Sequence, residues 1–111
     1  MIIYYEHRQL QKAASEYKEA VREWGSENAK KLFLRIQQIQ AASTLDEMLN
    51  MPGARFHALA HNRKGQFAID LKHPLRLIIK PAEPVPRMPD GGIDVSRVTE
   101  ILIVEVVDYH D

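Results

Sequence analysis

The chain has 111 residues, 15 basic and 15 acidic side chains, a formal net charge of zero and no cysteine. This composition excludes a disulfide framework and a thiolate zinc site, and the longest apolar run, residues 101–104, is too short to cross a bilayer. The length predicts one domain over residues 1–111 that buries its core without covalent staples. Because the chain lacks cysteine and its N-terminal segment does not resemble a signal peptide, we expect a cytoplasmic protein.

The zero net charge conceals a basic middle segment and an acidic C-terminal segment. Residues 54–80 hold six basic side chains and one acidic one, whereas residues 81–111 hold two basic and seven acidic side chains. A local basic surface is typical of proteins that bind a polyanion. The alternative is that the two segments neutralise each other in adjacent strands, and composition alone leaves both interpretations open.

The N-terminal half predicts a strand followed by two amphipathic helices. Residues 2–5 are β-rich, and apolar residues then recur at helical spacing over 10–24 and again over 29–39. Gly25 suits the position just past the end of the first helix. Two helices joined by so short a turn should form an antiparallel hairpin.

The C-terminal half has the alternating or β-branched pattern of strands. The expected strands cover residues 54–61, 65–73, 75–81 and 99–110. Gly65 suits a hairpin turn, His73-Pro74 marks the next turn, and residues 81–97, with their prolines and glycines, predict an exposed irregular loop. The last strand is apolar on both faces, so we expect it at the centre of its sheet.

These elements together predict an α+β fold with two layers. The N-terminal strand and the helical hairpin should pack on one face of a mainly antiparallel sheet, because both helices have an apolar surface to bury. Thr44 and Glu47 have the spacing of a capping box, which predicts a short helical turn between the helices and the later strands. The opposite face of the sheet should remain open to solvent and carry the basic segment.

Four motifs resemble those of a known family. They are "MPGARFHAL", "NRKGQFAIDL", the strand "LRLII" and the C-terminal "VVDYHD". Together they resemble the HigB-type toxins of the RelE/ParE superfamily, the toxin components of type II toxin–antitoxin pairs. The resemblance implies a RelE-like fold, a ribosome-dependent endoribonuclease that cleaves messenger RNA and inhibits translation, and a helix-turn-helix antitoxin of the HigA-like type as partner.

Two features depart from that family. Family members carry lysine at the position of Ala60, so either His61, Arg63 or Lys64 supplies the missing charge or the activity is reduced. The proline-rich loop at 81–97 replaces a connection that is often a tight hairpin. This loop is expected to alter the surface that meets the ribosome or the antitoxin.

The resemblance also directs attention to groups that can cleave RNA without metal, using the 2′-hydroxyl as nucleophile. His57 and His110 are the acid–base candidates, because histidine titrates near neutral pH. Arg76 presents a rigid fork to phosphate oxygens. Asp108 is expected to orient an imidazole, and Tyr109 to stack on a base or to donate its phenolic proton.

Further cationic or titratable side chains are candidates for binding RNA. These are His61, Arg63, Lys64 and Lys80. His61 has the alternative interpretation of a solvated turn residue. No closely spaced pair of histidine ligands is present, so we expect neither a metal site nor another cofactor.

Structural interpretations compete with the catalytic ones. His57 can be a hydrogen-bonding strand residue, and Arg76 can form an ion pair with Asp70 or with an acid of the last strand. Two alternative functions also stay open. One is a catalytically weakened toxin that only binds its antitoxin, and the other is a non-enzymatic module that acts on a protein target such as DNA gyrase.

Overall fold

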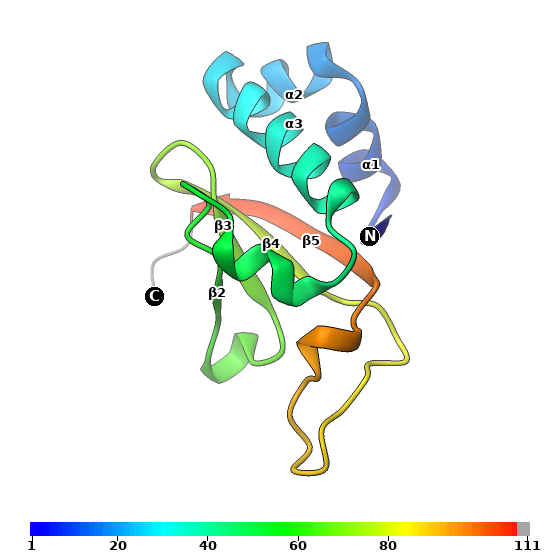
Figure 1. Ribbon diagram of the computed structural model, residues 1–111. Helices are drawn as coiled ribbons and strands as arrows, with labels where there is room; N and C mark the ends of the chain where they lie inside the picture. The colour runs from blue at the N-terminus through cyan, green and yellow to red at the C-terminus, as the bar shows by residue number, and fades with distance from the viewer. Residues whose placement is uncertain (109–111) are drawn as a thin grey trace.

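The computed structural model describes residues 1–108, in which helices and a sheet form two layers (Figure 1). The helices are α1 Arg8–Ser15, α2 Tyr17–Trp24 and α3 Ser26–Ala41. The strands are β1 Ile2–Tyr5, β2 His57–Ala58, β3 Phe67–Asp70, β4 Leu75–Pro81 and β5 Glu100–Asp108. Three 3-10 helices complete the described elements: η1 Leu45–Asn50, η2 His61–Arg63 and η3 Val95–Arg97.

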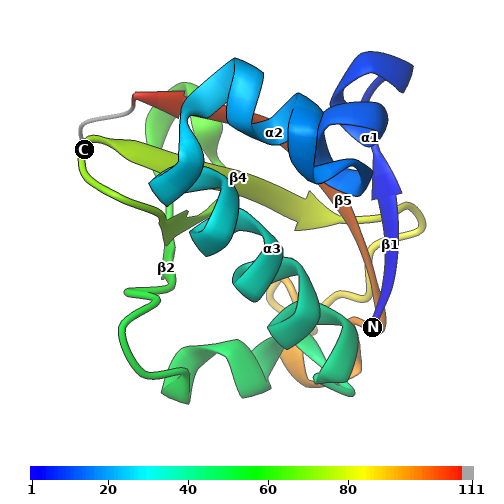
Figure 2. The same cartoon turned by 90° about the horizontal axis from the view of Figure 1, so that it is seen from above.

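The five strands form one sheet in the order β1-β5-β4-β3-β2. Only the β1–β5 pair is parallel, and the other three pairs are antiparallel. All three α-helices lie over the same face of this sheet, as the view from above shows (Figure 2). The expected α+β fold with two layers is therefore confirmed, but the N-terminal strand β1 is an edge strand of the sheet and does not pack on its face with the helices.

The core lies between the helices and the sheet, and strand alternation selects its side chains. Leu77 and Ile79 of β4 and Ile101 and Ile103 of β5 are fully buried on this side. They pack against the apolar stripe of α3, in which Ile39 is also fully buried. Side chains at alternate positions of a strand point to opposite faces, so the intervening residues of β4 face away from the helices.

The stretch predicted as one helix over 10–24 is broken into α1 and α2. Glu16 adopts the extended dihedrals φ −116° and ψ 113°, ends α1 and precedes α2. A single extended residue changes the helix axis without changing the apolar spacing. Hydrophobic periodicity therefore did not reveal the break.

Two further local predictions need correction. Thr44 does not form the reciprocal capping box, because Glu47 Oε2 accepts a hydrogen bond from the backbone N–H of Ser43, and Thr44 makes no side-chain cap. The strand expected over 54–61 is reduced to β2, which has two residues. The hairpin turn at Gly65 is confirmed, with φ of +92°.

The position of β5 also differs in part from the expectation. β5 lies between β1 and β4, but the ladder with β1 ends where Tyr5 pairs with Ile103. Beyond the irregularity that leaves Val104 without a ladder partner, residues 105–108 pair with β4 alone within the described part of the chain. The prediction that ladder hydrogen bonds hold the tip of β5 on both sides is therefore wrong. β1 is too short to reach it.

The segment between β4 and β5 forms a folded arm over residues 86–97. Arg87 and Ile93 form an isolated antiparallel bridge, and Asp94 N–H donates to the carbonyl of Pro86 at 2.9 Å. Arg97 Nη2 donates to the carbonyl of Arg87 at 3.1 Å. This arm extends from the end of the sheet away from the helices (Figure 1).

Candidate functional site

The face of the sheet turned away from the helices brings several predicted site residues together. Residues directly opposite in an antiparallel ladder share a face. One cross-strand row consists of Asp70, Arg76 and Val107, and the next consists of His57, Ala68, Ile78 and Glu105. His57 and Arg76 thus lie on the same face in adjacent rows, with β3 between their strands.

Arg76 is held by Asp70 within its row. Its Nε atom lies 3.2 Å from Oδ1 of Asp70, and its side chain is only 14% exposed. This is the ion pair that competed with the catalytic interpretation of Arg76. A guanidinium fixed in this way has a defined orientation, which is what a phosphate-binding group needs.

The same carboxylate holds a second arginine, which sequence reasoning did not select. Arg55 Nε donates to Oδ2 of Asp70 at 3.1 Å, and 59% of the Arg55 side chain is exposed. Asp70 therefore uses its two oxygens for two different arginines. The sequence offered one signal for this arrangement, since Asp70 is the only acid within residues 54–80.

A third arginine supports Asp70 from the helical layer. Arg35 of α3 is 2% exposed, and its Nε donates to the backbone carbonyl of Asp70 at 3.1 Å. Its Nη2 donates to the carbonyl of Gly53 at 2.8 Å. Burial lowers the pKa of Arg35, and the charge of Asp70 partly opposes this shift. Position 35 continues the apolar stripe of α3, which could have indicated its burial.

His57 enters the site through a backbone contact. Its Nδ1 atom lies 2.9 Å from the carbonyl oxygen of Arg55, and the ring is half-buried. In the neutral ring this contact places the proton on Nδ1, because a carbonyl oxygen only accepts. Nε2 then carries the lone pair, which is the state that a general base requires.

Arg63 forms a second ion pair over the open face. Its Nη2 atom lies 2.6 Å from Oε2 of Glu105, and its Nη1 atom donates to Gln66 at 2.9 Å. These contacts join η2 to β5, and Leu59 covers Ile78, which is fully buried although it lies on this face. Mutual neutralisation of the basic and acidic segments therefore holds for Arg63 and Glu105.

The other predicted RNA-binding residues are distributed over two places. His61 and Lys64 are exposed at η2, and Ala60 is exposed just before them. Lys80 pairs with Leu102, beside a pocket that Tyr4 and Glu100 also line. It lies four residues along β4 from Arg76, about 13 Å away, so the fold does not bring it to the Asp70 cluster.

The C-terminal candidates are only partly described. Asp108 pairs with Leu75, whose side chain packs against the helix-side core, so Asp108 belongs to the opposite face from Arg76 by its register. This placement follows from the irregularity at Val104, which shifts the alternation of β5. Tyr109 and His110 lie outside the described residues.

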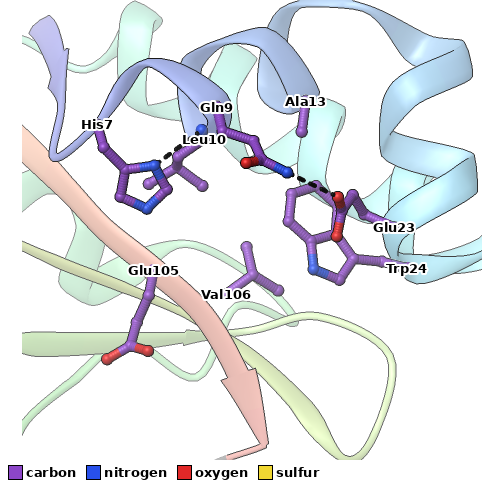
Figure 3. Close-up of a pocket in the computed structure, with 8 residues that line it drawn as sticks. All are labelled: His7, Gln9, Leu10, Ala13, Glu23, Trp24, Glu105 and Val106. Carbon is purple, nitrogen blue, oxygen red and sulfur yellow. Dashed lines mark hydrogen bonds between the residues drawn. The ribbon is translucent and has the colours of Figure 1, made fainter.

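A pocket of about 180 Å³ lies between the helices and β5. Figure 3 shows Leu10, Ala13 and Trp24 on its helical side and Val106 on its sheet side, whereas Glu105 points away from it. The pocket contains none of the candidate site residues. His7 at its rim is engaged as a helix cap, with Nδ1 accepting from the N–H of Leu10 at 3.2 Å. We therefore place the candidate site on the open face of the sheet.

Residues 1–108 contain no group of three histidine, aspartate or glutamate side chains arranged to hold a metal ion. No helix in this part of the chain is long and apolar enough to cross a membrane.

The fold is similar to that of a chain in the YoeB-YefM complex from Staphylococcus aureus. The TM-score is 0.56 and the sequence identity is 17%, and the match covers 100% of this chain and 98% of that chain. No family model matches the sequence. The comparison with curated proteins gives no match either. The chain therefore has a RelE-like fold, and at this identity the similarity extends to the fold alone.

Proposed function

We propose that the protein is the toxin of a type II toxin–antitoxin pair, of the HigB type, that cleaves messenger RNA on the ribosome and so inhibits translation. The observation that carries this proposal is the convergence of His57 and Arg76 on the open face of a RelE-like sheet. The motifs of the sequence support the same function. Its partners would be messenger RNA, the ribosome and a HigA-like antitoxin, in the cytoplasm.

The proposed reaction is metal-independent attack of the 2′-hydroxyl on the adjacent phosphorus. His57 Nε2 removes the hydroxyl proton as the new P–O2′ bond forms. Arg76 stabilises the negative charge that develops on the phosphate oxygens. The P–O5′ bond then breaks, and His110 protonates the departing oxygen, which leaves a 2′,3′-cyclic phosphate and a free 5′-hydroxyl. Tyr109 stacks on a neighbouring base in this scheme, and the register of β5 leaves the predicted role of Asp108 outside it.

Side chains at the edge of the open face would bind the flanking RNA. His61 and Lys64 are exposed at η2, where they can reach phosphates on one side of the cleavage point. Arg63 can bind a phosphate only if its ion pair with Glu105 is replaced by a contact with the RNA. Lys80, about 13 Å from Arg76 along its strand, would contact RNA two nucleotides or more away.

Induced expression tests this function directly. The expected result is growth arrest together with new 5′ ends in messenger RNA, mapped by primer extension, and no arrest with Arg76→Ala. Normal growth at a verified high level of folded protein would reject the toxin function. Co-expression with the helix-turn-helix protein of a neighbouring gene should restore growth.

One observation favours a second candidate function, a catalytically weakened or non-enzymatic module that acts by binding protein. Ala60 stands at an exposed position of the site where the resembled family carries lysine. A gyrase supercoiling assay beside the primer extension separates the two functions. Inhibition of supercoiling with intact messenger RNA would favour the binding module.

A further inference from the structure

Arg55 combines an anchored and an open side of its guanidinium group. Its Nε donates to Oδ2 of Asp70, while its Nη1 and Nη2 atoms make no hydrogen bond within residues 1–108. Its side chain is 59% exposed. A guanidinium held at one nitrogen and open at its outer edge presents two further donors to a phosphate oxygen pair.

The backbone of Arg55 also adopts an unusual conformation. Its φ of +46° lies in the left-handed region, which costs a residue with a Cβ about 1 kcal/mol or more. The carbonyl oxygen of this strained residue lies 2.9 Å from Nδ1 of His57. Arg55 therefore contacts both the candidate base and the carboxylate that holds Arg76.

The charges around Asp70 favour an added anion. Arg55 and Arg76 pair with its carboxylate, and Arg35 donates to its backbone carbonyl. Within residues 1–108, the carboxylate and carbonyl of Asp70 thus contact three arginines. The nearest acid in the adjacent row, Glu105, is paired with Arg63. Within residues 1–108, Asp70 therefore contacts more positive than negative charge, which favours a phosphate group beside Arg55.

We propose that Arg55 binds a phosphodiester group of an RNA backbone, and that Asp70 is a positioning residue that holds Arg55 and Arg76 as a two-arginine clamp. This inference rests on the proposed endoribonuclease function and adds to it roles for Arg55 and Asp70 that the sequence motifs containing them do not assign. In this arrangement Asp70 contacts no RNA. Asp70 sets the distance between the guanidinium group of Arg55, which lies just before β2, and that of Arg76, which lies in β4.

The test separates the side chain of Arg55 from its backbone. Arg55→Gly removes the guanidinium but keeps the left-handed φ and the carbonyl contact, because glycine adopts this conformation without steric cost. Arg55→Lys keeps the positive charge but lacks the planar guanidinium group that can donate two hydrogen bonds to one phosphate. Arg22→Ala is the matched control, since Arg22 is a 75% exposed arginine on α2 that pairs with Glu19. The probe is a fluorescent single-stranded 2′-O-methyl RNA, which cannot be cleaved.

Affinity is measured by anisotropy across a salt series. We expect Arg55→Gly to weaken binding about tenfold and to reduce the slope of log K against log salt by about 0.7, the value for one lost phosphate contact with a single strand. Arg55→Lys should recover the slope and only part of the affinity. Arg22→Ala should match the wild type, and melting temperatures should agree among all variants.

Asp70→Asn tests the positioning role. The substitution removes a negative charge, so the affinity for RNA should stay equal or increase. Cleavage should fall, because no carboxylate then fixes the guanidinium groups of Arg55 and Arg76. A purely structural role would lower both through unfolding. Cleavage at the wild-type rate in Asp70→Asn, with an unchanged melting temperature, would overturn the positioning role.

The outcomes also distinguish this inference from the function on which it rests. Wild-type binding and slope in Arg55→Gly would overturn the clamp while leaving the nuclease function intact. Weakened binding in Arg55→Gly, combined with a wild-type protein that cleaves no ribosome-bound messenger RNA, would support the clamp and reject the nuclease. A wild-type protein that does not bind the probe at low salt would overturn the clamp, and cleavage of ribosome-bound messenger RNA then decides the nuclease function separately.

Discussion

The Nε atom of Arg76 lies 3.2 Å from Oδ1 of Asp70, directly across the ladder between β3 and β4. Arg76 is the phosphate-binding candidate of the motif "LRLII", and Asp70 is the only acid within the basic segment 54–80. Because the Arg76 side chain is 14% exposed and that of Asp70 30%, the pair is shielded more than a surface salt bridge. Its two members are therefore expected to contribute both to stability and to the orientation of the site.

Substitution of Arg76 tests both contributions. Arg76→Ala should reduce RNA cleavage about 10²-fold or more, since a donor to the developing charge is lost. It should also lower the free energy of unfolding by about 1–3 kcal/mol, because Asp70 loses a partner. Cleavage assays and urea denaturation measure the two effects. Arg76→Lys should recover stability better than cleavage, and full activity in Arg76→Ala would remove this residue from the mechanism.

Ala60→Lys should raise cleavage by about tenfold, which corresponds to ~1.4 kcal/mol of transition-state stabilisation. Ala60 is exposed beside η2, so a lysine can be added there without disturbing the core. Ala60→Gln controls for side-chain length without charge. Equal rates for the lysine and glutamine variants would show that cations already present supply the required charge.

Deletion of residues 109–111 should abolish cleavage, because it removes Tyr109 and His110 from the proposed mechanism. The buried core residues that the structure describes lie between Leu10 and Ile103, so the melting temperature is expected to change little. Antitoxin binding, measured by co-purification, serves as the control for a folded protein. Cleavage at the wild-type rate by the truncated chain would refute the assignment of the C-terminal residues.

Arg35 is predicted to be structural. Arg35→Met should lower the free energy of unfolding by about 3 kcal/mol, because the buried carbonyls of Gly53 and Asp70 lose their donors. Arg22→Met, at a 75% exposed position, should change it by less than about 0.5 kcal/mol. Urea denaturation measures both. Similar values for the two variants would mean that water replaces the guanidinium of Arg35.

The arm at 86–97 should respond to acid through Asp94. Hydrogen bonds from Arg97 and then Ser96 lower the pKa of Asp94 below its ordinary 3.8. A lowered pKa means that the carboxylate stabilises the folded arm above pH 3.8, and that this stabilisation is lost as the pH falls through the lower folded value. Amide exchange at residues 94–97, compared with that in Asp94→Asn, measures the change. An identical acid response in the variant would contradict this origin.

Local sequence patterns correctly predicted the helices and strands that bury one continuous apolar face. The apolar spacing of α3 and the alternation of β4 correctly predicted a helix and a strand, because each buries one continuous face. The same patterns did not reveal the break at Glu16 or the irregularity at Val104. One residue with different dihedrals changes direction or register while leaving composition and spacing nearly unchanged.

The two-layer α+β fold follows from the spacing of apolar residues along the chain, and the residue types alone make Arg76 and His57 candidates for phosphate binding and proton transfer. Their partners become visible in the folded chain, because ion pairs form between residues that the strand register brings together. Asp70 meets Arg76 through the β3–β4 ladder, and Arg55 reaches the same carboxylate from a left-handed backbone that no spacing rule anticipates. Likewise, the irregularity in β5 places Asp108 on the helix side of the sheet, since one unpaired residue reverses the face that each side chain of residues 105–108 takes.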